Sequence, residues 1–324
     1  MPRSRESAGV HSGCVVIDCH CDALGVEVLR GSLELHSRPH GHFDVARARE
    51  GGLTCVFLAC CECDGGPGFA RSTAEALEAI ARESGGALSL AVSVSDVRAA
   101  RESGGLAAVL HLEGAGLLGD TVGGVRLFHE LGARSVGLVH KRKNAAAESV
   151  TDCPSGAGLT DFGVKLVREM NALGMLIDVA HLSKAGLDDV LELSSAPVIY
   201  SHGNCLALCD HVRNLDDRQI ASIASRGGVM CMSFVPYFLA PEREGASVRT
   251  LVEHVLHAAS VGGIDHVGIG SDFDGFRGAP PIGLEDVSCY GGITAELLAA
   301  GLNEADCRNV MGGNVLRLME EVIG

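Results

Sequence analysis

Five strand-like hydrophobic runs of this chain end in a side chain that can bind a metal or move a proton. The first run, Val15–Cys19, is rich in β-branched residues and leads directly into the first of these side chains. A single strand-end histidine or carboxylate is common in proteins, whereas a repeated pattern is hard to produce by core packing alone. In chain order the side chains are His20 with Asp22, then Glu113, His181, His202 and Asp272.

Strand geometry predicts that these side chains meet. Alternate residues of a strand point to the same side, so His20 and Asp22 can bind one ion together. Parallel strands that close into a barrel bring their carboxyl ends to one rim, where active sites of such barrels lie. The pattern therefore indicates an active site assembled at one rim of a parallel barrel.

The residue types fit a site for two zinc ions. Zinc binds imidazole and carboxylate ligands, and a hydrolytic site leaves room for water. Two ions about 3.5–4 Å apart need a bridging carboxylate and can activate a shared hydroxide. The set assigns His20 and Asp22 to one ion, His181 and His202 to the other, and Glu113 between them. The carboxylate after the last of these runs is then free to handle protons.

Strand-like and helical patterns alternate along the chain, which predicts a (β/α)8 barrel. A ninth strand-like run, 87–94, reads as an insertion before the third barrel strand. Helical patterns cover Thr160–Leu173, Ser183–Leu193, Asp216–Ser225 and Ser247–Val261. The predicted strands are 15–19, 53–59, 107–113, 135–140, 175–181, 197–202, 228–234 and 266–272.

No linker, repeat or charge block divides the 324 residues, so we expect a single barrel domain over 1–324. Within it, residues 1–13 are expected to form a loose N-terminal segment. Residues 23–52 are expected to carry a small hairpin or helix on the active-site side. The glycine-rich stretch 275–292 is expected to be an irregular loop.

Composition excludes several classes of function. A net charge of −15 argues against nucleic acid as a partner, because binding phosphates needs a basic surface. No window reaches the roughly 18 apolar residues of a membrane span, and the first residues lack the apolar core of a signal peptide. We therefore expect a cytoplasmic protein that acts without a membrane partner, and the sequence leaves a homodimer open.

Thirteen cysteines, an odd number, are expected to be free thiols in a long chain without a secretion signal. Cys60, Cys61 and Cys63 form the one dense cluster. The cluster could bind a soft metal, but no second cysteine pair follows at the spacing of a zinc finger. We expect these three thiols to be reduced and dispensable for binding the two zinc ions.

Several motifs of the chain, spread in order over residues 15–322, resemble those of the membrane (renal) dipeptidase family of zinc peptidases. Together they make a specific combination, although each is short. The motifs are Ile17–Asp22, His111–Gly114, Ile177–Ser183, Tyr200–His202, Arg213–Asp217, Gly268–Gly275 and Asn309–Arg317.

The resemblance implies a barrel of the metal-dependent amidohydrolase type that hydrolyses dipeptides with a metal-bridging hydroxide, and that often accepts a D-residue at the C-terminal position. It implies that Asp272 is the acid/base, that His140 contacts the scissile carbonyl and that Arg213 binds the substrate carboxylate. It also implies a zinc pair held by His20, Asp22, Glu113, His181 and His202, as the residue types already suggest.

The chain departs from the family pattern around the pocket. Cys21 stands where the family usually has asparagine, and Ala23–Gly25 replaces a sequence similar to Leu-Pro-Trp. Asn144–Ser149 lacks an aromatic residue that is common there, and Phe234 stands where a tyrosine is often found. These differences predict a roomier pocket and leave the preferred side chains of the dipeptide open.

Two rival functions stay open. The first is another barrel amidohydrolase, which would act on a cyclic amide, an N-acyl amino acid or a deaminable base. Such enzymes often carry a carbamylated lysine between the metals, but here Glu113 stands at the third strand and no lysine precedes Lys141 near the fourth. The second rival is a catalytically silent homologue, which the loss of a ligand would favour, yet none is lost.

Overall fold

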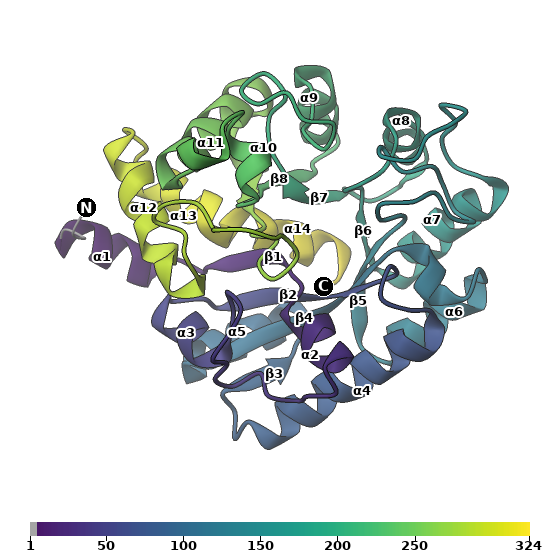
Figure 1. The fold of residues 1–324 in the computed structure, drawn as a ribbon, viewed down its shortest axis with the longest axis horizontal. Helices are drawn as coiled ribbons and strands as arrows, with labels where there is room; N and C mark the ends of the chain where they lie inside the picture. Colours follow the sequence, from purple (N-terminus) through teal and green to yellow (C-terminus); the bar gives the residue numbers. More distant parts are fainter. Residues whose placement is uncertain (1–4) are drawn as a thin grey trace.

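The computed structural model describes residues 5–324, which contain one sheet of parallel strands wrapped by helices (Figure 1). The strands are β1 (Ile17–Cys21), β2 (Cys55–Cys61), β3 (Leu88–Leu90), β4 (Leu106–Glu113), β5 (Ala133–Gly137), β6 (Leu176–Asp178), β7 (Ile199–Gly203), β8 (Val229–Met232) and β9 (Val267–Ile269). Each barrel strand is buried along most of its length, as expected when helices cover one side and core side chains fill the other.

Eight of these strands form a nearly closed barrel, which confirms the predicted (β/α)8 architecture. Their order is β1-β2-β4-β5-β6-β7-β8-β9, and β3 pairs only with β4 outside this path. Backbone bonds join the two ends of the order: Asp22 N donates to Phe273 O at 2.8 Å, and Asp272 N donates to His20 O at 3.0 Å. The insertion before the third barrel strand is therefore also confirmed.

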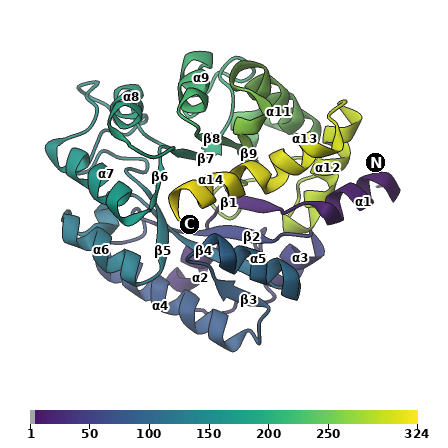
Figure 2. The same ribbon diagram turned by 180° about the vertical axis from the view of Figure 1, so that it is seen from behind.

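A ring of helices surrounds the barrel (Figures 1 and 2). The four predicted helical patterns correspond to α7 (Asp161–Leu173), α8 (Lys184–Leu193), α9 (Asp217–Ser225) and α11 (Val248–Gly262). The α-helices are α1 (Arg5–Gly13), α2 (Ala23–Leu29), α3 (Val45–Glu50), α4 (Pro67–Glu83), α5 (Val94–Ser103), α6 (Val122–Glu130), α7 (Asp161–Leu173), α8 (Lys184–Leu193), α9 (Asp217–Ser225), α10 (Pro236–Leu239), α11 (Val248–Gly262), α12 (Tyr290–Ala299), α13 (Glu304–Arg308) and α14 (Asn314–Val322). None of the described helices is long and apolar enough to cross a bilayer.

The N-terminal segment differs from the prediction. Residues 1–4 lie outside the described part of the chain, but Arg5–Gly13 forms helix α1 and not a loose segment. Val10 and Cys14 are buried, and the His11 ring lies 2.8 Å from the Thr294 hydroxyl of α12. The prediction failed because helix α1 packs against α12, almost 300 residues away in the sequence.

The two irregular stretches are partly ordered as helix. The stretch 23–52 contains α2 and α3, which agrees with the expected small helix. The stretch 275–292 is irregular up to Asp286 and then forms a short 3-10 helix, Val287–Cys289, that leads into α12. The expected loop therefore ends several residues earlier than predicted.

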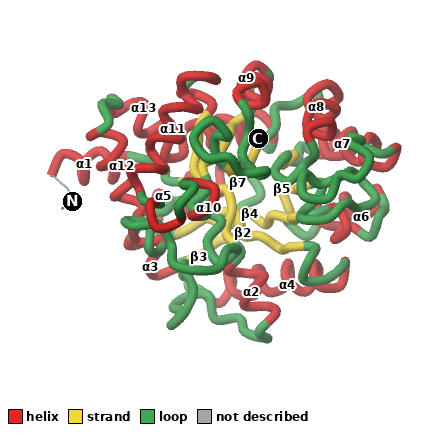
Figure 3. The backbone as a smooth tube through the Cα atoms, turned by 45° about the horizontal axis from the view of Figure 1, so that its top comes forward, coloured by secondary structure: helices red, strands yellow, loops and turns green. Residues whose placement is uncertain are grey.

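Helix α14 closes the amino-terminal end of the barrel. Figure 2 shows α14 running across that end, and its Val315, Leu318 and Met319 pack in one cluster with inward-facing strand residues such as Phe57 and Val109. This apolar floor leaves the opposite, carboxyl end for polar side chains. In Figure 3 loops run in front of the strands on that side.

The apolar floor generates a stability prediction. Leu318 is fully buried, so Leu318→Ala should lower the free energy of unfolding by about 2–5 kcal/mol, because it removes apolar contacts and leaves a cavity. Chemical denaturation of both proteins measures the difference. Glu321→Ala on the same helix removes only a surface ion pair with Arg317 and should cost about 0.5 kcal/mol or less. Equal losses of unfolding free energy in the two variants would show that the apolar side chains of α14 do not stabilise the amino-terminal end of the barrel.

Candidate metal centre

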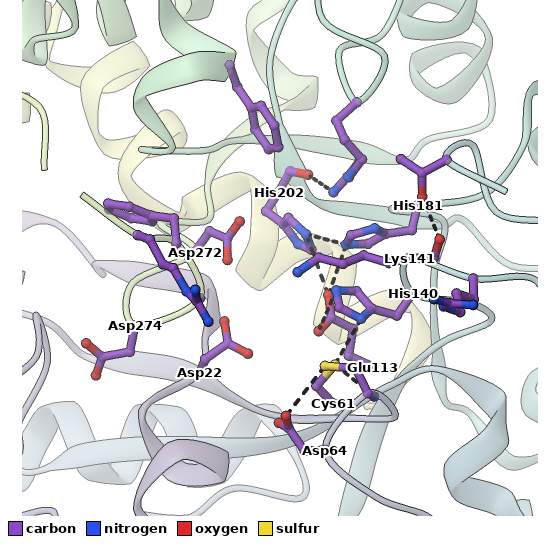
Figure 4. A pocket seen from close by; sticks show the side chains of 18 of the residues that line it. Asp22, Cys61, Asp64, Glu113, His140, Lys141, His181, His202, Asp272 and Asp274 are labelled. Atoms are coloured by element: carbon purple, nitrogen blue, oxygen red, sulfur yellow. Dashed lines mark hydrogen bonds and ion pairs between the residues drawn. The ribbon is translucent and has the colours of Figure 1, made fainter. Parts of the chain in front are cut away.

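A cavity of about 780 Å³ opens at the carboxyl end of the barrel. The close view in Figure 4 shows Glu113, His140, His181 and His202 together at its base, with Asp272 on another wall. All eight site residues predicted from the sequence lie in or beside this cavity: Asp22, Glu113, His140, His181, His202, Arg213 and Asp272 line it, and His20 touches Asp22 and Glu113 from below.

Glu113 is the centre of the cluster. Its Oε1 atom lies 3.1 Å from His181 Nε2, 3.6 Å from His20 Nε2 and 3.7 Å from His202 Nε2. The other oxygen, Oε2, lies 3.9 Å from His140 Nε2. All five side chains are buried. One carboxylate thus faces imidazoles from four different strands or strand-end loops.

Asp22 and Asp272 complete the cluster on the side of His20. His20 Nε2 lies 3.5 Å from Asp22 Oδ2. One ligand atom from each of His20, Asp22 and Asp272 falls within 4.8 Å of the others. These three residues and the Glu113 group overlap at His20, so the structure offers two adjacent positions for cations.

The ordinary alternation of β4 aims Glu113 into the barrel, whereas His20 and His202 depend on irregularities. The pairing register of β1 with β2 shifts between Asp18 and Cys21, and that of β7 with β8 shifts between Tyr200 and Gly203. A shift of this kind changes which way the next side chain points. His20 and His202 lie within the two shifts, which explains how both reach Glu113.

Three site residues hold a backbone conformation that non-glycine residues rarely adopt. The φ angles of His181, Asp272 and Asp274 are 67°, 62° and 66°. Such left-handed residues cost free energy and persist where the surroundings impose them. Gly275 beside them has no room for a side chain, because a Cβ would lie 2.2 Å from oxygens of both Asp22 and Asp272.

The charges of the cluster explain its protonation. Burial by itself would raise the pKa of Glu113, but His140, His20 and His181 hold it well below its usual range. Burial would lower the pKa of His20, but Glu113, Asp22 and Asp272 raise it to about 10. Burial holds the pKa of His202 well below its usual range, so this imidazole is neutral. The metal-free cluster therefore keeps a proton on His20 in place of a cation.

The donor set fits zinc or a similar divalent cation. Imidazole nitrogens and carboxylate oxygens are its usual ligands. In the described chain the Nδ1 atoms of His20 and His181 are buried without a hydrogen-bond partner, while their Nε2 atoms face Glu113. His202 has Ser201 Oγ at 2.8 Å from its Nδ1, and that hydroxyl donates to Asp178. Such an outer partner fixes the orientation of a ligand ring.

Asp272 has the protonation expected of an acid/base. Burial is the main cause that raises its pKa to about 7, with Asp22 and Glu113 adding to the rise and His20 opposing it. General acid–base groups work best when their pKa is near the working pH. A cation bound beside Asp272 would favour the ionised form, which is the form that accepts a proton.

Arg213 lies on the wall of the cavity, where the protein accepts hydrogen bonds from two of its five N–H donors. Its Nη1 donates to Tyr200 OH at 2.6 Å and its Nη2 to the His202 carbonyl at 3.1 Å. Its buried Nε has no partner in the described residues. A guanidinium has five N–H donors, so Nε and one hydrogen on each Nη stay available for an anion.

Two contacts at the site were missed from the sequence. The Tyr200 hydroxyl contacts both the side chain and the backbone of Arg213. It accepts a hydrogen bond from Nη1 and donates one to the Arg213 carbonyl at 2.5 Å. Cys61 Sγ lies 3.0 Å from His140 Nδ1 and 2.8 Å from Cys63 Sγ. Hydrogen bonds from Cys61 and His140 lower the pKa of the Cys63 thiol. The Cys-x-Cys spacing indicates that the two thiols lie close together, but it does not predict their contact with His140.

The chain is similar in sequence to dipeptidases and in fold to solved metallo peptidases. Dipeptidase tcpJ of Claviceps purpurea is 39% identical over 236 residues, which cover 72% of this chain and 55% of tcpJ. The matched region therefore spans only about half the length of that relative.

Two solved structures match this chain over nearly its whole length. The dipeptidase AC, described as a metallo peptidase of family M19, is 31% identical with a TM-score of 0.88 over 96% of this chain and 99% of its own.

The second solved structure contains a ligand. It is a metallo peptidase from Rhodobacter sphaeroides liganded with a phosphinate mimic of the dipeptide L-Ala-D-Ala, and it is 29% identical with a TM-score of 0.87 over 95% of this chain and 99% of that one. The model of the membrane dipeptidase family, peptidase family M19, matches residues 4–323. The chain belongs to the membrane dipeptidase family.

Proposed function

We propose that this chain is a metallo-dipeptidase that hydrolyses free dipeptides with two zinc ions bridged by Glu113. In this proposal His20 and Asp22 bind one ion, and His181 and His202 bind the other. The observation that carries the proposal is the position of Glu113 Oε1, which lies 3.1–3.7 Å from three imidazole Nε2 atoms. A bridging carboxylate is what two adjacent divalent ions require.

The proposed substrate class rests on the family and on the free donors of Arg213. Tetrahedral phosphinates imitate the transition state of peptide hydrolysis, and the one bound to the Rhodobacter relative mimics a dipeptide with a D-residue at its C-terminal position. Here the free donors of Arg213 suit a C-terminal carboxylate, because charge-assisted bonds to a guanidinium are strong and directional. A guanidinium is indifferent to the chirality of the neighbouring carbon, so we propose that L- and D-residues are both accepted.

The chain's own groups account for orientation and proton transfer. Two zinc ions bound at the site would supply Lewis acidity and a nucleophile at neutral pH. Asp272 accepts the proton of the attacking water and returns it to the leaving amine. His140 donates from Nε2 to the oxygen of the scissile carbonyl as negative charge develops there, an interaction worth about 2.7–4 kcal/mol in comparable sites. Arg213 holds the carboxylate and so sets the register of the peptide.

The rival functions have less support. Glu113 is the group that faces His20, His181 and His202 at the base of the cavity. Lys141 also lines the cavity but is exposed. This argues against an amidohydrolase with a carbamylated lysine. A silent homologue would have no need to keep Asp272, a half-buried carboxylate in left-handed backbone, against its free-energy cost.

Of the predictions that follow from the proposed function, the first concerns the metal content. Elemental analysis of the protein loaded with zinc should find two ions per chain, and Glu113→Gln should lose both, because the bridge holds them together. At pH 8 the metal-free protein carries a proton on His20, whose pKa is raised to about 10. Zinc binding should therefore release at least one proton, which a pH indicator measures, and the zinc affinity should fall as the pH falls. One ion or none in an active enzyme would contradict the binuclear site.

The second prediction concerns Asp272. Asp272→Asn cannot take a proton and should lower kcat for dipeptides by about 10²- to 10⁴-fold while the zinc content and KM change little. Steady-state kinetics and metal analysis of the same sample test this. Asp152→Asn is the matched control: Asp152 lines the same cavity, where it accepts a bond from the Lys143 backbone. Loss of zinc from the Asp272 variant would show instead that Asp272 is mainly a ligand.

The third prediction concerns Arg213 and substrate length. The wild type should cleave L-Xaa-L-Xaa and L-Xaa-D-Xaa dipeptides and act poorly on tripeptides and on C-terminally amidated dipeptides. Arg213→Met should raise KM for free dipeptides about 10- to 100-fold, because a hydrogen bond to a charged group contributes about 1.5–3 kcal/mol. The same variant should narrow the preference for free over amidated substrates.

A matched variant distinguishes the effect of the Arg213 guanidinium from that of the Tyr200 hydroxyl that contacts it. Tyr200→Phe removes the hydroxyl that touches Arg213 but leaves the guanidinium in place, so it should keep the preference for free carboxylates. Equal cleavage of free and amidated dipeptides by the wild type would show that Arg213 does not bind the substrate carboxylate.

A further inference from the structure

A second set of metal-binding side chains lies beside the Glu113 cluster, at the end of β2. Cys61 is the last residue of β2 and pairs in register with Glu113 of β4. Alternate residues of β2, Cys55 and Phe57, belong to the barrel interior, so Cys61 faces inward as well. The strand thus places a thiol on the inner face at the level of Glu113.

The turn after β2 brings a second thiol to the first. The side chain of Glu62 points away and accepts bonds from the backbone N–H groups of Gly116 and His140 at 2.9 and 3.0 Å. These bonds hold the turn, and Cys63 returns so that its Sγ lies 2.8 Å from Cys61 Sγ. Both thiols line the cavity, Cys61 buried and Cys63 exposed.

An imidazole nitrogen completes the set. His140 Nδ1 lies 3.0 Å from Cys61 Sγ, and single ligand atoms of Cys61, Cys63 and His140 all fall within 4.8 Å of one another. Asp64 Oδ1 lies 3.5 Å from Cys63 Sγ. Figure 4 shows Cys61, Asp64 and His140 together on one side of the cavity, away from Asp272 and Asp274.

We propose that Cys61, Cys63 and His140 form a third metal site that binds a soft divalent cation such as Cd²⁺. Thiolates select such cations, and two sulfurs with one imidazole nitrogen are a common part of a zinc ligand set. The fourth position faces the cavity and Asp64. This site differs in chemistry from the Glu113 cluster, which offers only nitrogen and oxygen atoms.

The geometry allows a cation after a small adjustment. Zn–S bonds of about 2.3 Å at a tetrahedral angle place two sulfurs about 3.8 Å apart, about 1 Å more than in the metal-free protein. Cys63 is exposed, so its side chain can move outward by this amount without disturbing the core. Cys61 and His140 are buried and supply the fixed part of the site.

The two nitrogens of His140 link the third site to the Glu113 cluster. A cation on Nδ1 leaves the proton of the neutral ring on Nε2, the atom that faces Glu113 at 3.9 Å. A ring in this form donates from Nε2 toward the cavity. This consequence rests on the proposed function, in which His140 Nε2 donates to the substrate carbonyl, whereas the metal site itself does not.

Cadmium titration of the full-length protein, purified with reductant and then loaded with two equivalents of zinc, tests the proposal. Cadmium bound to thiolate gives a charge-transfer absorption in the ultraviolet, which nitrogen and oxygen ligands do not give. We expect this absorption to rise and saturate at one cadmium per chain. Cys61→Ser and Cys63→Ser should each remove most of it. Cys153→Ser, which changes another exposed thiol, should keep both the absorption and the dipeptidase activity.

A second measurement needs no variant. Cadmium should slow the alkylation of Cys63 by N-ethylmaleimide at least 10-fold, read by mass spectrometry of the peptide, and should leave the alkylation rate of Cys153 unchanged.

Three results would overturn the third site: no thiolate absorption with cadmium, an absorption that survives Cys61→Ser, or a Cys61–Cys63 disulfide in the reduced preparation. None of them depends on dipeptide hydrolysis. A protein that binds cadmium at Cys61 and Cys63 but cleaves no dipeptide would contradict the proposed function and leave the third site standing.

Discussion

A buried carboxylate must be neutralised, and the rest of this site is arranged around that requirement. Glu113 lies at the base of the cavity among His20, His140, His181 and His202, with almost no exposure to solvent. The field of this carboxylate and its acidic neighbours raises the pKa of His20 to about 10, so in the metal-free protein a proton takes the place of a cation. Removing positive charge from this cluster leaves a buried anion uncompensated, which costs several kcal/mol. Divalent cations satisfy the same requirement with more charge.

Closure of the barrel makes this arrangement of charges possible. Imidazoles and carboxylates come from β1, β4, β7 and the loops after β5, β6 and β9, and backbone bonds from Asp22 and Asp272 join β9 to β1 directly at the site. Asp272, which makes one of these bonds, is in left-handed backbone. Helix α14 fills the other end with apolar side chains, and the cavity opens at the carboxyl end. The fold therefore separates an apolar amino-terminal end of the barrel from a polar carboxyl-terminal end.

The ends of the predicted strands were enough to predict six of the site residues from the sequence, whereas the roles of His140 and Arg213 were implied by the family resemblance. Alternation along β4 requires Glu113 to face the same way as Val109, and all eight predicted site residues lie in or beside the cavity. Periodicity could not reveal the register shifts that aim His20 and His202, because a shift depends on the neighbouring strand. It also missed the packing of helix α1 against α12, and the contact of His140 with Cys61, which is 79 residues away. Each of these depends on long-range geometry without a local pattern.

His140 shows why such long-range contacts matter for chemistry. Its ring has one nitrogen toward Glu113 and the other toward a thiol, and the partner of the second nitrogen decides whether the first can donate a proton. A histidine whose Nδ1 faces water exchanges freely between its two neutral forms. Here Cys61 is buried and fixed by the register of β2 with β4, so the ring has little freedom to turn or to change partners. One partner of the His140 ring, Cys61, therefore lies on β2, which β4 separates from β5 in the barrel, and outside the motifs that resemble the family. Variation at the end of β2 can alter the electrostatics of the cavity while every residue of the Glu113 cluster stays the same.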